Sequence, residues 1–188
     1  MSRFNIVVLG DGGVGKSSLT LRIIVDEFIE DYDPTIEDHY VKKILVDGIY
    51  SEVDITDTAG QEEFFTIRNN SAKIADGIIL VYSIINLNSY YEAIKIIEEI
   101  IITKEKKVPV ILVGNKLDLR NEREVSDSLG KKLEEKYKLI FYETSAKYNV
   151  FADEIFFELI REIRKVRWKE KKNEEEIKNI NNKTCIIL

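Results

Sequence analysis

The sequence holds one cysteine, two prolines and one histidine among its 188 residues. A single cysteine cannot close a disulfide within the chain, which excludes a disulfide-stapled scaffold and fits a reducing compartment. No apolar stretch approaches the ~18 residues of a membrane-spanning helix, and the apolar run near the start is too short for the core of a secretory signal. We therefore expect any contact with a membrane to be peripheral.

An excess of positive charge is also missing. The formal net charge of −6 argues against a nucleic-acid partner, because nucleic-acid-binding proteins usually carry a basic face. The charge is uneven: residues 161–188 contain nine Lys or Arg and five Glu, a local net charge of +4, whereas the rest of the chain carries −10. A basic end on an acidic body is more typical of a segment that faces a membrane than of a general polyanion binder.

Apolar, β-branched segments alternate along the chain with segments of helical periodicity. We expect strands over residues 4–9, 39–46, 50–57, 77–83, 108–115 and 139–143, and helices over residues 16–25, 90–102, 126–137 and 151–168. Asp47 and Gly48 suit a tight hairpin turn, so one strand is expected to be antiparallel to its neighbour. The alternation predicts an α/β fold with a mostly parallel, six-stranded sheet and about five flanking helices, whose ligand lies beyond the carboxyl ends of the strands.

The composition changes at about Lys169. The stretch KEKKNEEEIKNINNKT is rich in Lys, Glu and Asn and has almost no apolar periodicity, which predicts a flexible tail. We expect one domain over residues 1–168 and a polar tail over residues 169–188.

A glycine-rich motif follows the first expected strand. GDGGVGKS, residues 10–17, matches G-x-x-x-x-G-K-[ST] and stands between a predicted strand and a predicted helix. The backbone N–H groups of such a loop point inward, and the helix N-terminus adds partial positive charge, so the loop can wrap around phosphates. Lys16 would bridge the β- and γ-phosphates, and Ser17 would ligate Mg²⁺. The motif predicts a P-loop NTPase-type fold that binds a nucleoside triphosphate, but it does not identify the base.

A second motif, NKLD, follows the strand over residues 108–115 and suggests the base. The carboxylate of Asp118 can accept two parallel hydrogen bonds from the N1–H and N2–H₂ edge of guanine. Adenine offers no such donor pair and would leave the carboxylate unpaired. Asn115 would bind the N7 side of the base or brace the phosphate loop, and the stem of Lys116 would cover the ring. In the later triplet SAK, the N–H of Ala146 would meet guanine O6 and Lys147 would pack on the ring.

A third motif, DTAGQE, begins at the end of the strand over residues 50–57. Asp57 can hold Mg²⁺ through a water molecule, on the side opposite Ser17. Gly60 can offer its N–H to the γ-phosphate and, lacking a Cβ, can move when that phosphate leaves. Gln61 is the candidate that orients the attacking water.

These motifs occur in the order and spacing of the small GTPases, so the chain over about residues 3–168 resembles the Ras/Rap branch of that family. The resemblance implies binding of GTP and GDP with Mg²⁺, and slow hydrolysis of GTP with Gln61, Lys16 and Gly60 as catalytic groups. It implies that Ser17, Thr35 and Asp57 serve the metal and that Phe28 covers the guanine. The nucleotide-binding set that it implies is Gly12, Gly13, Val14, Gly15, Lys16, Ser17, Ser18, Phe28, Tyr32, Thr35, Ala59, Gly60, Asn115, Lys116, Asp118, Ser145, Ala146 and Lys147.

The resemblance also implies partners. Loss of the γ-phosphate would release the loop around Thr35 and the loop after Gly60, an order-to-disorder switch. No resident catalytic arginine is evident, so a GTPase-activating protein and a guanine-nucleotide exchange factor are expected. The segment YDPTIEDHY resembles the loop that contacts Ras and Rap effectors, namely Tyr32, Asp33, Pro34, Thr35, Ile36, Glu37, Asp38, His39 and Tyr40.

Single residues do not decide between Ras-like and Rap-like partners. Glu30, Asp31 and Gln61 resemble Ras, Phe64 leans towards Rap, and His39 departs from the common serine of both groups. Asp11, between two glycines of the phosphate loop, is unusual and adds negative charge near the phosphates.

The chain given ends in CIIL, which matches a prenylation box at Cys185, and its final leucine favours a geranylgeranyl group. One lipid gives only reversible membrane binding, so a second signal is expected. The cluster Arg164, Lys165, Arg167, Lys169, Lys171 and Lys172 is the candidate for that signal, although neighbouring Glu residues dilute it. We expect a lipid-anchored protein on the cytoplasmic face of a membrane, most simply the plasma membrane.

Two other functions stay open from the residues alone. A P-loop kinase or ATPase would share the phosphate loop, but NKLD and SAK speak against it. A GTP-binding module with little turnover would share the base pocket, but Gly12, Gly60 and Gln61 leave nothing needed for hydrolysis missing.

Overall fold

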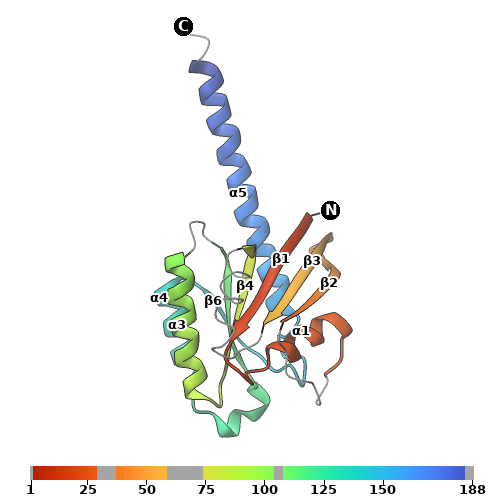
Figure 1. Ribbon diagram of the computed structural model, residues 1–188, viewed down its shortest axis with the longest axis vertical. Coiled ribbons are helices and arrows are strands. Elements are labelled where there is room, and N and C mark those ends of the chain that lie inside the picture. Colours follow the sequence, from red (N-terminus) through yellow and green to blue (C-terminus); the bar gives the residue numbers. More distant parts are fainter. Residues whose placement is uncertain (1, 29–36, 59–73, 104–107, 185–188) are drawn as a thin grey trace.

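The computed structural model describes residues 2–28, 37–58, 74–103 and 108–184. Six strands in the described residues form a single sheet, and helices cover both of its faces (Figure 1). In chain order the elements are β1 (Ser2–Gly10), α1 (Lys16–Val25), β2 (Glu37–Val46), β3 (Ile49–Thr58), β4 (Gly77–Ser83), α3 (Leu87–Thr103), β5 (Val110–Asn115), the 3₁₀ helix η2 (Leu117–Glu122), α4 (Asp127–Tyr137), β6 (Ile140–Glu143) and α5 (Glu154–Thr184).

The sheet confirms the predicted α/β architecture. Its strand order is β2-β3-β1-β4-β5-β6, and every neighbouring pair is parallel except β2 and β3. The hairpin that joins β2 to β3 turns through Asp47 (φ 52°) and Gly48 (φ 75°). Two consecutive residues at positive φ are what a two-residue hairpin needs to match the twist of its strands, and Asn, Asp and Gly tolerate that conformation best.

The two faces of the sheet carry separate hydrophobic clusters. Along β1, Phe4, Ile6 and Val8 pack with side chains of α1 and α5, whereas Val7 and Leu9 pack with side chains of α3 and α4. Successive strand residues point to opposite faces, so one buried strand feeds both clusters. A strand buried on both sides reads as the unbroken apolar run seen in the sequence.

Two helix starts differ from the prediction. Helix α3 begins at Leu87, before the predicted start at Tyr90, because the Asn86 side chain accepts a hydrogen bond from the N–H of Ser89 (3.1 Å) and satisfies the first turn. Helix α5 begins at Glu154, because Phe151 adopts positive φ (53°) and lies outside the helix. Inside α4, Gly130 has a packing reason: a Cβ there would lie 2.2 Å from the ring of Phe141.

Helix α5 corrects the prediction for the tail. It was expected to stop at Trp168, but it runs on to Thr184, so the stretch predicted as a flexible tail is helical as far as that residue. The polar sequence continues the helix because Lys and Glu are good helix formers, and the side chains of residues 169–175 are exposed. In Figure 1 this part of α5 projects away from the rest of the molecule. No described helix combines the length and apolar character needed to cross a bilayer.

Two arginines fasten the buried part of α5 to the β2–β3 hairpin. The Arg161 guanidinium donates to Asp47 and to Glu154. The hydrogen bond between Arg161 and Asp47 holds the pKa of the Asp47 carboxyl below its usual value. Arg164 donates to the carbonyl oxygens of Val46 and Ile49, both at 2.9 Å. The helix is therefore attached to the sheet by polar contacts as well as by its apolar face.

Tyr82 on β4 is a local weakness in the core. Its side chain is fully buried, its hydroxyl has no hydrogen-bond partner among the described residues, and burial raises the pKa of the phenol. Removing an unsatisfied buried hydroxyl stabilises a core, so we expect Tyr82→Phe to raise the free energy of unfolding by about 1 kcal/mol. Urea unfolding of the purified protein measures the change.

Tyr90→Phe is the matched control, because the Tyr90 hydroxyl does donate, to the carbonyl of Leu129 (3.3 Å). That variant should lose stability or stay unchanged. A Tyr82→Phe protein less stable than the parent would show that its hydroxyl has a partner after all.

Candidate functional site

The expected site residues follow strands whose carboxyl ends meet at one edge of the sheet. The register places Val8 of β1 beside Asp57 of β3, and Gly10 beside Val81 of β4. It continues across the sheet, with Ser83 of β4 beside Asn115 of β5. The phosphate loop and the segments after β3, β5 and β6 therefore start from the same edge.

Three glycines of the phosphate loop, at positions 10, 13 and 15, adopt positive φ, and at two of them a Cβ would also collide with a neighbour. Gly10 (φ 145°) lies against β4, and a Cβ there would be 2.1 Å from the carbonyl oxygen of Val81. Gly15 (φ 96°) precedes α1, and a Cβ there would be 2.4 Å from Nδ2 of Asn115. Gly12 and Gly13 have open space beside them. The first and last glycines of the motif thus serve the close packing of the loop itself.

Lys16 and Asp11 both turn back onto the loop. The Lys16 side chain is largely buried, and its Nζ donates to the carbonyl oxygen of Asp11 (2.8 Å). An ammonium group is therefore held over the loop at the N-terminus of α1. The Asp11 carboxylate accepts a hydrogen bond from the N–H of Gly12 (2.7 Å), so it lies against one of the backbone donors of the loop and not outward.

Asn115 joins the phosphate loop to the segment after β6. It is buried, its Nδ2 donates to the carbonyl oxygen of Val14 (3.0 Å), and its Oδ1 accepts from the Thr144 hydroxyl (3.0 Å). Of the two roles expected for Asn115, this geometry is that of the brace. Because the bonds are buried and all three groups are satisfied, the two segments are held as one unit.

Asp118 and Ser145 are brought together as the sequence motifs suggested. The Ser145 hydroxyl donates to Oδ1 of Asp118 (2.6 Å) and accepts from the N–H of Tyr148 (3.2 Å). The carboxylate is thus held in one orientation by a buried serine, while Asp118 itself is partly exposed. Beside them Ala146 is buried and Lys147 is exposed.

The turn that carries Asp118 is also shaped locally. Lys116 adopts positive φ (71°) directly before η2. The N–H of Leu117 donates to the carbonyl of Thr144 (2.9 Å), and the N–H of Thr144 donates to the carbonyl of Gly114 (2.9 Å). These backbone bonds set the two loops side by side, so the position of Asp118 relative to Ser145 does not depend on side chains alone.

Two expected metal ligands lie at the same edge. Ser17 is in the first turn of α1 and partly buried, and Asp57 is completely buried at the end of β3. Next to Asp57, the Thr58 hydroxyl donates to the carbonyl of Val8 (2.9 Å), which ties the end of β3 to β1. A hydroxyl, a carboxylate and phosphate oxygens are hard oxygen donors of the kind Mg²⁺ prefers, so the described residues fit this ion.

The remaining expected residues lie partly within and partly outside the described ranges. Phe28 is partly buried against the cluster that contains Val14 and Ala146. Of the effector loop, residues 37–40 begin β2, and exposed His39 makes a hydrogen bond with Thr56 (3.1 Å). The expected residues outside the described ranges are Glu30, Asp31, Tyr32, Asp33, Pro34, Thr35, Ile36, Ala59, Gly60, Gln61, Phe64 and Cys185.

Two supporting contacts were not foreseen from the sequence. Thr144 holds Asn115, and the guanidinium of Arg123 makes a paired contact with the carboxylate of Glu143, which raises the pKa of Arg123 further. The position of Thr144, between a strand and the SAK triplet, is the one sequence signal that could have pointed to it. Arg123 and Glu143 are separated by 20 residues without any motif, so no sequence pattern linked them.

Comparison with known proteins agrees with this geometry. The model of the Ras family matches residues 5–165. A curated relative, the Ras-related protein O-RAL of Diplobatis ommata, is 41% identical over 190 residues, an alignment that covers 97% of this chain and 92% of that protein. This chain therefore belongs to the Ras family of small GTPases, which hydrolyse GTP.

Proposed function

We propose that the chain is a Mg²⁺-dependent molecular switch whose nucleotide lies at the carboxyl edge of the sheet. The observation that carries the proposal is the buried link from Val14 through Asn115 to Thr144, together with the bond between Ser145 and Asp118. A single rigid unit then contains both the phosphate loop and the residues proposed to select the base. Family membership favours this function over a P-loop kinase or ATPase, and over a binding module without turnover.

The phosphates are proposed to lie over the loop of residues 12–18. The N–H groups at the start of α1 and the Lys16 ammonium supply positive charge there, and Lys16 is already held over the loop by its bond to Asp11. Bound Mg²⁺ would neutralise developing charge on the phosphate oxygens. Ser17 and Thr35 would offer hydroxyl ligands, and Asp57 would orient a water on the metal.

The base is proposed to lie between Phe28, Lys116 and Lys147, with its polar edge at Asp118. Ser145 prevents the carboxylate from rotating, so both acceptor directions needed for guanine are preorganised. A competition assay tests the whole site: unlabelled GDP should displace a fluorescent guanine nucleotide, and ADP should not at a thousandfold excess. Equal displacement by ADP would contradict the proposal.

The switch itself is proposed to involve Thr35 and Gly60, whose loops would respond to the γ-phosphate. Gln61 would orient the attacking water, and activating and exchange proteins would set the rates of hydrolysis and exchange. Effectors would bind the loop of residues 32–40, which leads into the edge strand β2. A pull-down that compares the GTP-loaded and GDP-loaded forms tests this step, because a switch must present two different surfaces.

Asp11 is expected to weaken nucleotide retention. Its carboxylate lies against Gly12, on the loop proposed to hold the phosphates. Two like charges about 4 Å apart in water repel by roughly 1 kcal/mol. We expect Asp11→Ala to slow dissociation of fluorescent GDP about fivefold. Glu122→Ala, at an exposed site in η2, is a control for the loss of one negative charge. Faster dissociation from the Asp11 variant would show that the carboxylate instead supports the loop.

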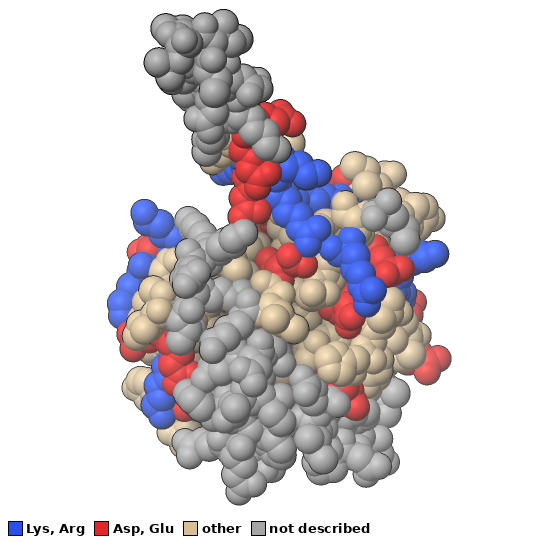
Figure 2. All heavy atoms as spheres, turned by 45° about the horizontal axis from the view of Figure 1, so that its top comes forward, with Lys and Arg blue, Asp and Glu red and all other residues tan. Residues whose placement is uncertain are grey.

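Membrane attachment is proposed to occur through a prenyl group on Cys185. Lys and Arg gather where α5 leaves the domain, but Asp and Glu lie among them (Figure 2). Mixed charge gives weaker attraction to anionic lipid than an undiluted basic cluster. We therefore propose that the lipid supplies most of the anchoring.

Replacement of Cys185 tests this anchor. Cys185→Ser is expected to move the protein from the membrane fraction to the soluble fraction in cells, because one missing lipid removes most of the binding energy. The charge-reducing pair Lys171→Gln and Lys172→Gln should leave a larger share on the membrane. A Cys185→Ser protein that stays with membranes would exclude the prenyl anchor.

A further inference from the structure

A cavity of about 700 Å³ lies at the edge of the sheet opposite the phosphate loop. Val110 begins β5 and Ile140 begins β6, and Val108 and Leu139 lie just before these strands. Because β1, β5 and β6 are parallel to their neighbours, these amino ends lie at the edge away from Gly10. The volume is within the range of roughly 300–1,000 Å³ that small-molecule sites occupy.

The floor of the cavity is aliphatic. Ile97, Ile100 and Ile101 reach it from the end of α3, and Val166 reaches it from α5. Ile101 is 57% exposed, so the floor includes apolar surface that the domain leaves in water. Such a surface gains free energy when an apolar ligand covers it.

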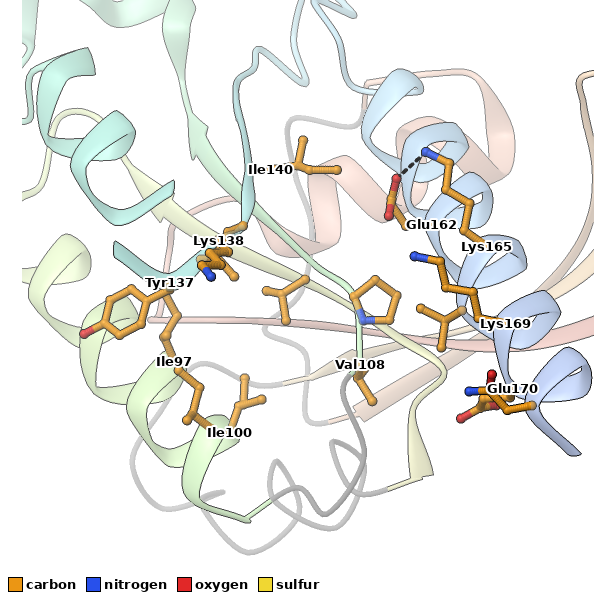
Figure 3. Close-up of a pocket in the computed structure, with 16 residues that line it drawn as sticks. Ile97, Ile100, Val108, Tyr137, Lys138, Ile140, Glu162, Lys165, Lys169 and Glu170 are labelled. Atoms are coloured by element: carbon orange, nitrogen blue, oxygen red, sulfur yellow. Dashed lines mark hydrogen bonds and ion pairs between the residues drawn. The ribbon is translucent and has the colours of Figure 1, made fainter. Parts of the chain in front are cut away.

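The rim of the cavity is basic on two opposite sides. Figure 3 shows Lys138, which follows α4, on one side of the apolar side chains and Lys169 of α5 on the other. Neither ammonium group forms an ion pair with a side chain in the described part of the chain. The Glu162 carboxylate is already paired with Lys165 (2.6 Å). The described lining holds three lysines and two glutamates, Glu162 and Glu170, so its net charge is positive.

The cavity also continues along α5. A smaller cavity of about 110 Å³, lined by Ala75, Asp76 and Arg167, shares Val108, Val166 and Glu170 with the larger one. Shared lining residues place the two spaces next to each other along α5, and we call this pair of cavities the trough. A trough with an aliphatic floor suits a flexible hydrocarbon chain better than a ring system.

We propose that this trough binds a single-chain anionic amphiphile, such as a fatty acid or an alkyl phosphate, with its chain over the isoleucines and its headgroup at Lys138 or Lys169. Apolar burial supplies most of the affinity, and the ammonium groups select an anionic headgroup.

The occupant is a free amphiphile and not a lipid within a bilayer. Helix α5 continues straight beyond the trough and projects from the domain (Figure 1). A bilayer that holds the end of this helix would meet the helix before it met the trough. This exclusion of a bilayer rests on the proposed lipid anchor, whereas the lining residues named for the trough do not involve it.

Isothermal titration of the GDP-loaded, unprenylated full chain with dodecyl phosphate, kept below its micelle concentration, tests the inference. We expect one binding site, no heat with inorganic phosphate alone, and at least tenfold weaker binding of an uncharged dodecyl glycoside. Ile101→Asp should weaken binding at least tenfold, because it places a carboxylate on the floor. Ile102→Asp is its control, since Ile102 is 82% exposed, is the next residue in the same helix and does not line the cavity.

A second pair of variants tests the rim. Lys138→Glu combined with Lys169→Glu should weaken binding at least tenfold. Lys132→Glu combined with Lys171→Glu should not, because Lys132 of α4 and Lys171 of α5 undergo the same change of charge but do not line the trough. Retention of fluorescent GDP should be the same in all variants. The inference is overturned if dodecyl phosphate does not bind, if it binds all variants equally, or if vesicles with anionic lipid bind the unprenylated protein through Ile101 more tightly than the free amphiphile does.

Discussion

Asp118→Asn should weaken GDP binding about a thousandfold, because two hydrogen bonds from guanine to a charged acceptor, each contributing roughly 1.5–3 kcal/mol, are lost. The same variant should gain affinity for xanthosine diphosphate. The Ser145 hydroxyl would donate to the remaining oxygen of the new side chain and leave its NH₂ group facing the base. That group can donate to the C2 carbonyl of xanthine but opposes the C2 amino group of guanine. Equilibrium titration with both diphosphates measures the change.

Ser145→Ala is the informative control for this experiment. It removes the group that orients Asp118 and leaves the carboxylate in place. Guanine affinity should then fall about tenfold, as expected for one lost hydrogen bond, with the preference for guanine over xanthine retained. Unchanged GDP affinity in Asp118→Asn would remove the proposed base pocket.

Gln61→Leu should lower GTP hydrolysis about a hundredfold or more, since a leucine cannot orient the attacking water and misplacement of a reacting group has effects of this size. Nucleotide affinity should persist, because the contacts proposed for binding lie in other segments. Single-turnover release of phosphate from the GTP-loaded protein measures the rate, and chromatography of the bound nucleotide checks that GTP remains.

Activation separates this effect from a general loss of structure. A GTPase-activating protein should accelerate the parent and leave Gln61→Leu slow. His39→Ser, at an exposed site on β2, should retain the parental intrinsic rate. A Gln61→Leu protein that hydrolyses GTP at the parental rate would show that another group positions the water.

The sheet was predictable because its signals are local. Buried runs such as that around Ile79 and Leu80 have no competing interpretation at their length, and the turn at Asp47 and Gly48 fixes the antiparallel pair. The base and phosphate motifs were predictable for the same reason, since each follows a strand directly. The order of these motifs along the chain then indicated the family.

The parts that were not predictable depend on contacts between distant residues or on a single dihedral angle. The start of α5 depends on the positive φ of Phe151. A positive φ is uncommon for an aromatic residue, so the sequence does not indicate it. The brace at Thr144 and the contact between Arg123 and Glu143 become visible only when the strands are aligned. The length of α5 was missed because low apolar periodicity was taken as disorder, although Lys and Glu support an exposed helix.

The length of α5 changes what its end can do for the domain. The sixteen residues from Lys169 to Thr184 span about 24 Å as a helix. As a random coil, the same residues would have a root-mean-square span of about 22 Å, so the average reach is nearly unchanged. The difference lies in orientation. A random coil would leave the orientation of the domain independent of the end of the chain. A helix that Arg161 and Arg164 attach to the β2–β3 hairpin couples the tilt of its end to the orientation of the sheet. A surface that fixes the tip would therefore also determine which side of the domain faces away from that surface.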